Sequence, residues 1–114
     1  MTPYVLTAYH CVEGSANINQ NNYFTFYFNH QSSSCSSNGN NYNYSITGSV
    51  FKAWDDMYSS DFALLEMFNE PPPYFDAYYA GWSRYTSSQS ISTGIHHPGG
   101  APKKINFDKK RTCQ

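Results

Sequence analysis

Apolar and polar residues alternate along much of the chain with a period of two, and no segment sustains the 3.6-residue period of an amphipathic helix. The alternating segments are rich in β-branched and aromatic residues, which favour strands. The segments that we predict to be β-strands are 4–8, 23–28, 44–54, 74–82, 90–96 and 103–107. Several short strands at nearly regular spacing predict an all-β sandwich or barrel.

Three segments qualify this pattern. Asp61–Met67 is compact and mostly apolar, so that helix and strand both remain open for it, and Pro71–Pro73 sets only where it ends. Gly48 interrupts one predicted strand and indicates a bulge. Residues 31–43 are mostly Ser, Asn and Gly with one Cys, which is typical of an exposed loop.

The length limits what such a fold can do. The chain has 114 residues and shows neither an internal repeat nor a dividing linker, so we predict one domain at most. An all-β barrel enzyme that works as a single domain usually needs about 200–250 residues. The chain is therefore either a small module or part of something larger.

The charge and the apolar stretches of the chain argue against nucleic acid and against a membrane as partners. The net charge is -1 and only 13% of residues are charged, which argues against nucleic acid. Five of the seven basic residues lie in the last twelve positions, but Asp108 interrupts them and a solvated strand and tail explains them. No stretch approaches the roughly 18 apolar residues of a membrane span. Low charge with many Tyr, Asn and Ser is typical of a secreted bacterial protein, although the first residues lack the features of a signal peptide.

The three cysteines, Cys11, Cys35 and Cys113, allow one disulfide with one thiol left over. No CxxC or HxxxH spacing occurs, and the adjacent His10 and Cys11 are poorly placed to close on one ion. The sequence thus predicts neither a metal nor a cofactor.

Two residues carry candidate chemistry. His10 follows the first predicted strand, and Asp61 stands directly before the apolar run 62–67. Each has a plain structural explanation by itself, as a surface histidine or a turn aspartate. Together they match a nucleophilic hydrolase, which needs an imidazole that carries a proton and a carboxylate that orients it. The order of His before Asp is that of chymotrypsin-type enzymes.

The segments around these residues extend the match. Leu6-Thr7-Ala8-Tyr9-His10-Cys11 resembles the catalytic-His signature of trypsin-like serine proteases, and Ser60-Asp61-Phe62-Ala63-Leu64-Leu65-Glu66 resembles their catalytic-Asp signature. A narrower resemblance is to the bacterial lysyl endopeptidase branch. The segments that carry it are Thr2-Pro3-Tyr4-Val5-Leu6-Thr7-Ala8, Ala80-Gly81-Trp82-Ser83-Arg84 and Ile95-His96-His97-Pro98 with Lys103-Lys104-Ile105.

The resemblance implies an incomplete chymotrypsin-like double β-barrel: residues 1–114 would be the first barrel and the start of the second, the N-terminal part of a catalytic domain. It implies His10 as general base and then general acid, Asp61 as its orienting partner, and a protein or peptide substrate cleaved after lysine. It also implies a Cys11–Cys35 disulfide, which leaves Cys113 without a partner. His96 and His97 match no triad position, so we expect a structural role for them.

The nucleophile of such an enzyme is absent from these residues. No Gly-x-Ser-Gly occurs, and the serines that follow a glycine, Ser15 and Ser49, lie too early for the order His, Asp, Ser. The Gly-rich loop of an oxyanion hole is also absent. We therefore expect a fragment that lacks the C-terminal half of its domain and is inactive alone.

Two alternatives belong to other classes. One is a protease-like binding or structural protein without activity, against which the intact His10 and Asp61 argue. The other is a small aromatic-rich carbohydrate-binding module, since the chain has 11 Tyr and 8 Phe. Quenching of tryptophan fluorescence by oligosaccharides would support that module, and a flat titration would remove it.

Overall fold

The computed structural model describes residues 1–13, 22–34, 44–86 and 91–109, which fold as β-strands and short 3-10 helices without an α-helix. The strands are β1 (Tyr4–Thr7), β2 (Asn22–Phe28), β3 (Tyr44–Asp55), β4 (Phe62–Met67), β5 (Ile91–His96) and β6 (Lys104–Lys109). The 3-10 helices are η1 (Tyr9–Cys11), η2 (Pro73–Phe75) and η3 (Pro98–Gly100). No helix of these residues has the length and apolar character needed to cross a membrane.

The chain divides into two compact units. The first contains Met1–Phe28 and Asn43–Ala77, and the second contains Asn29–Tyr42 and Tyr78–Gln114. Each unit thus joins two segments that are distant in the sequence. No single linker in the sequence therefore marks the boundary between the units.

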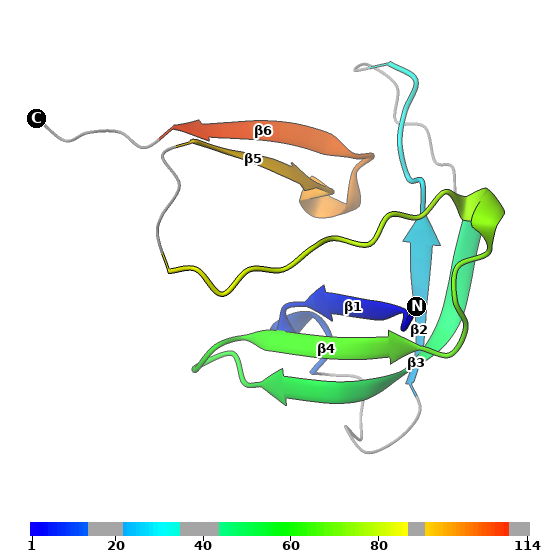
Figure 1. Ribbon diagram of the computed structural model, residues 1–114, viewed down its shortest axis with the longest axis vertical. Helices are drawn as coiled ribbons and strands as arrows, with labels where there is room; N and C mark the ends of the chain where they lie inside the picture. The colour runs from blue at the N-terminus through cyan, green and yellow to red at the C-terminus, as the bar shows by residue number, and fades with distance from the viewer. Residues whose placement is uncertain (14–21, 35–43, 87–90, 110–114) are drawn as a thin grey trace, which may run out of the picture. The chain divides into compact units, whose positions relative to one another are not determined.

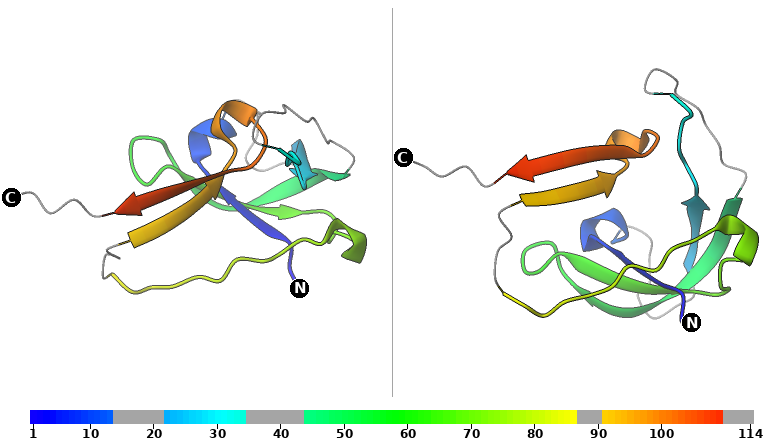
Figure 2. Two further views of the ribbon diagram at one scale, coloured as in Figure 1. Left: turned by 90° about the horizontal axis from the view of Figure 1, so that it is seen from above. Right: turned by 45° about the horizontal axis from the view of Figure 1, so that its top comes forward.

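The first unit is a four-stranded antiparallel sheet with the strand order β1-β4-β3-β2 (Figure 1). β4 lies between β1 and β3, so the first and last strands of this unit are neighbours. β3 bends strongly along its length and the sheet curls (Figure 2), as expected for twisted strands. This curled sheet and the small second sheet confirm the prediction of an all-β fold with an incomplete barrel.

Two irregularities shape the long strand β3. Its pairing with β2 shifts between Asn22 and Thr25, opposite Gly48, so a bulge lies where the glycine indicated one, with the extra residue on the partner strand. Gly48 has a φ of 102°, and a Cβ there would overlap the ring of Phe68. A second bulge, between Phe51 and Ala53, has no signal in the sequence.

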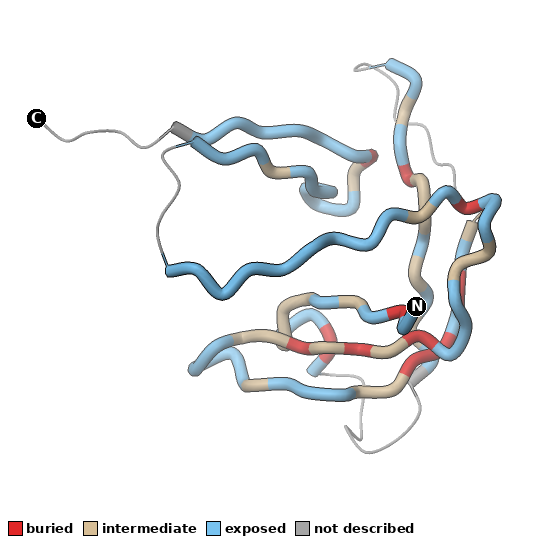
Figure 3. The backbone as a smooth tube through the Cα atoms, in the orientation of Figure 1, coloured by how far each residue is buried: buried red, intermediate tan, exposed pale blue. Residues whose placement is uncertain are grey.

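The core of the first unit lies along β4 (Figure 3). Ala63, Leu65 and Met67 are buried while the residues between them are only partly covered. This period of two identifies the apolar segment as a strand rather than a helix. Leu65 and Ala63 pack with Val12 in one cluster, and Met67 packs with residues of β3 and η2 in the other.

The second unit holds a two-stranded antiparallel sheet, β5 with β6.

The prediction of a strand at 74–82 was wrong: this segment begins with η2 and continues without a ladder. Asp76 ends η2 in the left-handed region (φ 50°, ψ 42°), and Tyr78 and Trp82 are almost fully exposed. Aromatic residues favour strands only where a partner strand completes the ladder, and no described strand pairs with this segment, although Phe75 is buried in the core of the first unit.

Candidate functional site

His10 and Asp61 come together because β1 and β4 are antiparallel neighbours. The register pairs Thr7, near the end of β1, with Ala63, near the start of β4. His10 follows Thr7 by three positions and Asp61 precedes Ala63 by two, so both residues leave the sheet at the same edge. The ladder thus closes a separation of 51 positions in the chain.

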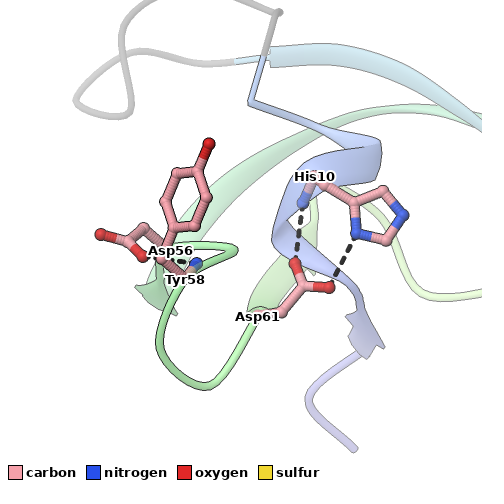
Figure 4. Close-up of polar contacts among 4 residues, drawn as sticks. All are labelled: His10, Asp56, Tyr58 and Asp61. Carbon is pink, nitrogen blue, oxygen red and sulfur yellow. Dashed lines mark hydrogen bonds and ion pairs between the residues drawn. The ribbon is translucent and has the colours of Figure 1, made fainter.

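Both oxygens of the Asp61 carboxylate face His10 (Figure 4). The His10 backbone N–H donates to Asp61 Oδ1 at 3.0 Å, and the ring atom Nδ1 lies 2.7 Å from Oδ2. Because one carboxylate holds both the main chain and the ring, it fixes where the imidazole lies and how it is turned.

The same contacts favour the ionised form of Asp61. The hydrogen bond from the His10 backbone N–H, followed by the bond from its side chain, lowers the pKa of Asp61 below its ordinary value. An ionised carboxylate only accepts hydrogen bonds, so Nδ1 carries the proton of the 2.7 Å contact. In the neutral imidazole, the lone pair is then on Nε2, which points away from Asp61 in Figure 4.

A short loop presents Asp61 in this orientation. The carbonyl of Asp56 accepts hydrogen bonds from the N–H groups of Ser59 (3.1 Å) and Asp61 (3.0 Å). The Asp56 side chain accepts a bond from the Tyr58 N–H at 2.8 Å (Figure 4). Asp61 itself has a φ of 45°, a left-handed conformation that Asp tolerates better than most residues. The loop closes on itself and turns the carboxylate toward η1.

The 3-10 helix η1, which carries His10, is held by backbone hydrogen bonds and by packing against β4. The carbonyl of Tyr9 accepts hydrogen bonds from the N–H groups of Val12 (2.8 Å) and Glu13 (2.9 Å). Val12 is buried against Ala63 and Leu65 of β4. The turn that carries His10 is therefore packed onto the strand that follows Asp61.

The pair is accessible in the first unit. The side chains of His10 and Asp61 are 52% and 32% exposed. Among the described residues, no serine hydroxyl is hydrogen-bonded to Nε2 of His10. The arrangement can accept a proton at Nε2 and stabilise the resulting imidazolium through Asp61.

The predicted disulfide is not decided by the structure. Cys11 is exposed at the end of η1, while Cys35 and Cys113 lie outside the described residues. The Cys11–Cys35 bond therefore stays a prediction. Within the described parts of the chain, no group of three or more His, Cys, Asp or Glu side chains could hold a metal ion.

The histidines near the end of the chain lie in the second unit. His96 is exposed on β5, opposite Lys104. His97 stacks on the buried His30 with the ring centroids 5.5 Å apart, and its Nδ1 lies 3.0 Å from the carbonyl of Ala101. The contacts of His97 fasten the loop that includes η3. Sequence reasoning missed His30, for which no local signal exists.

It also missed the aspartates of the loop before Asp61. Asp56 caps the N–H of Tyr58, and Asp55 accepts hydrogen bonds from the hydroxyls of Ser59 and Ser60, which lower the pKa of Asp55. A signal for them was present, because Asp and Ser commonly bond to nearby backbone in turns.

A known family matches this chain, and it is related to the branch that the segments around this site resemble. The family model described as "Lysyl endopeptidase, C-terminal domain" matches residues 1–114, the whole chain. This match establishes a protease-related protein, while the trypsin-like catalytic fold and the roles of single residues stay predictions. The chain belongs to the lysyl endopeptidase C-terminal domain family.

Proposed function

We propose that this chain carries the general base and the orienting carboxylate of a serine-type endopeptidase. The observation that supports the proposal best is the double contact of Asp61 with the backbone and the ring of His10. A surface ion pair needs only one such contact. A catalytic imidazole needs both position and tautomer fixed, because its other nitrogen must be aimed at the nucleophile.

In the proposed reaction, Nε2 of His10 takes the proton of a serine hydroxyl as that oxygen attacks the scissile carbonyl. The ionised Asp61 stabilises the imidazolium, which then gives its proton to the leaving amine. A water molecule repeats the cycle and releases the acyl group. The serine and the oxyanion hole would come from sequence beyond these 114 residues, which contain no Gly-x-Ser-Gly.

The finer assignments rest on resemblance. These are the chymotrypsin-like double barrel, with residues 1–114 as a partial catalytic domain, the preference for lysine, protein or peptide substrates, and secretion. The family match supports only the coarser statement of a lysyl endopeptidase-related protein. None of them follows from the His10–Asp61 geometry alone, so each needs its own measurement.

The experiment has two steps. Purified residues 1–114 should not hydrolyse a lysyl ester or amide above buffer, because the nucleophile is missing. The DNA downstream of codon 114 should then encode a Gly-x-Ser-Gly within the next hundred or so codons, and the lengthened chain should cleave lysyl esters faster than arginyl or alanyl esters. A stop codon at 115, or turnover by residues 1–114 that His10→Ala abolishes, would contradict the proposal.

The lengthened chain also tests the two residues. Asp61→Asn should lower kcat by about 10⁴-fold, because the amide favours the wrong tautomer of the imidazole. The matched control is Asp76→Asn. Asp76 has a similar left-handed conformation, with a φ of 50° against 45° for Asp61, but it lies at the end of η2 and contacts neither residue of the pair. Equal losses in both variants would assign the effect to folding.

A further inference from the structure

A stacked pair of aromatic rings lies beside the candidate site. The rings of Tyr9 and Trp54 are nearly parallel, with an interplanar angle of 19° and centroids 5.1 Å apart. Tyr9 directly precedes His10 in η1. Trp54 lies on β3 and pairs with Ala63, and Ala63 follows Asp61 by two positions. The stack therefore connects the segments that carry the two polar residues, without using the hydrogen bonds between those residues.

The unpredicted bulge in β3 puts Trp54 in this place. Phe51 pairs with Leu65 and Trp54 pairs with Ala63, so three steps on β3 correspond to two steps on β4. Residues three apart on a regular strand point to opposite faces. The extra residue, Lys52, shifts the alternation and brings Trp54 to the face that Phe51 occupies.

This face is where η1 packs. Ala63 and Leu65 are buried there with Val12, and Tyr9 and Phe51 lie against the same cluster. The bulged residue is itself held, since Lys52 Nζ lies 2.8 Å from Glu66 Oε2. Glu66 of β4 thus forms an ion pair beside the bulge.

The loop between Trp54 and Asp61 transmits the position of the ring. Asp55 follows Trp54 directly, and its Oδ1 accepts a hydrogen bond from the N–H of Asp56 at 3.0 Å. The carbonyl of Asp56 in turn accepts the N–H of Asp61 at 3.0 Å. A displacement of Trp54 therefore moves the start of a closed loop whose last residue is Asp61.

We propose that the Tyr9–Trp54 stack is a positioning brace that keeps His10 against Asp61. The role of the brace in catalysis rests on the proposed function, but its effect on the pair does not. Aromatic pairs contribute beyond the area they bury. Loss of this stack should lower the population of the doubly bonded geometry by about two- to tenfold.

The test measures the bonding of the pair in the 114-residue chain, by carbon-13 NMR titration of the Asp61 carboxyl. Trp54→Ala and Tyr9→Ala should raise the pKa of Asp61 toward its ordinary value, because the bonds from His10 that lower it are weakened. Trp54→Phe keeps an aromatic face, so the pKa of Asp61 should stay nearly as low in this variant as in the parent chain.

Two controls separate positioning from general loss of stability. Trp82→Ala removes the other tryptophan, which is 85% exposed in the second unit. Ile46→Val weakens the core cluster that contains neither ring. Both should leave the pKa of Asp61 unchanged. If Trp54→Ala does not fold, Trp54→Leu keeps the apolar contact, removes the stack and is read in the same way.

The outcomes are distinct. An unchanged Asp61 pKa in folded Trp54→Ala or Trp54→Leu would overturn the proposal, as would an equal rise in Ile46→Val. In the lengthened chain, Trp54→Ala should lower kcat by about two- to tenfold with KM unchanged, since the brace contacts no substrate in this proposal. Absence of turnover in that chain would count against the proposed function and would leave the NMR result standing.

Discussion

The two units of this chain contain sheets of the same antiparallel kind, yet they differ in what lies on their faces. In the first unit, β4 has a strand on each side, and its residues Ala63 and Leu65 are at most 1% exposed. In the second unit, β5 has one partner, and its apolar residues Ile91 and Ile95 are 62% and 65% exposed (Figure 3). The candidate site belongs to the unit with the buried core.

The difference follows from the pairing of each sheet. The register of β5 with β6 places Ile95 opposite Ile105 and Thr93 opposite Phe107, so the apolar residues share one face. Ile105 and Phe107 are 60% and 74% exposed. An isolated two-stranded sheet is marginally stable in water. The contacts of 3.0 and 2.7 Å between His10 and Asp61 are therefore supported by a buried core, which the β5–β6 sheet lacks among its described residues.

Amide exchange gives the largest expected contrast between the units. The amide of Leu65 should exchange at least about a thousandfold more slowly than that of Ile95, because opening of β4 requires loss of the core while β5 has little to lose. Hydrogen–deuterium exchange followed by NMR measures both amides in one sample. Equal protection of the two strands would break the comparison.

Truncation of a core residue should separate the units by stability. Leu65→Ala should lower the free energy of unfolding by about 2–5 kcal/mol, since Leu65 is 1% exposed and its loss leaves a cavity. The matched change Ile105→Ala should cost less than about 1 kcal/mol, because that side chain is 60% exposed. Urea denaturation measures both, and a larger loss in Ile105→Ala would show a core in the second unit.

Replacement of one glycine in each unit by alanine should also change stability by different amounts. Gly48→Ala should cost about 1–3 kcal/mol, because φ is 102° and the new Cβ would meet the ring of Phe68. Gly99 in the second unit also has a positive φ, of 59°, but open space surrounds its Cβ position. Gly99→Ala should therefore cost less in the same urea assay, and equal costs would mean that the Phe68 contact contributes nothing.

The smallest expected effect is the dependence of stability on pH. The pKa of Asp61 is lower in the folded chain than its ordinary value of about 3.9. Its stabilising contribution is therefore complete above that value and is lost as the pH falls through the folded pKa. Thermal unfolding from pH 6 to pH 2 should show a weaker pH dependence in Asp61→Asn than in the parent chain, and equal dependences would contradict the contribution of Asp61.

The all-β class was predictable from the alternating pattern of the sequence, whereas the details that depend on strand register were not. His10 and Asp61 were identifiable because short motifs surround them, and the antiparallel neighbours β1 and β4 bring them together. The bulge at Lys52 was not predictable, since a bulge depends on the register with a partner strand. The same reason explains the missed coil at 74–82, whose residues favour a strand that no neighbour completes.

The β1–β4 pairing also sets the order of events during synthesis of the chain. The ribosome releases His10 long before Asp61, and the two residues of the pair meet only after β4 has emerged and closed on β1. Such distant pairings form slowly, because the intervening chain must be ordered first. A nascent chain that ends before Asp61 holds His10 without its carboxylate, and one that ends before Met67 has not completed the strand that brings the two residues together, so the His10–Asp61 contact forms only with a completed β4.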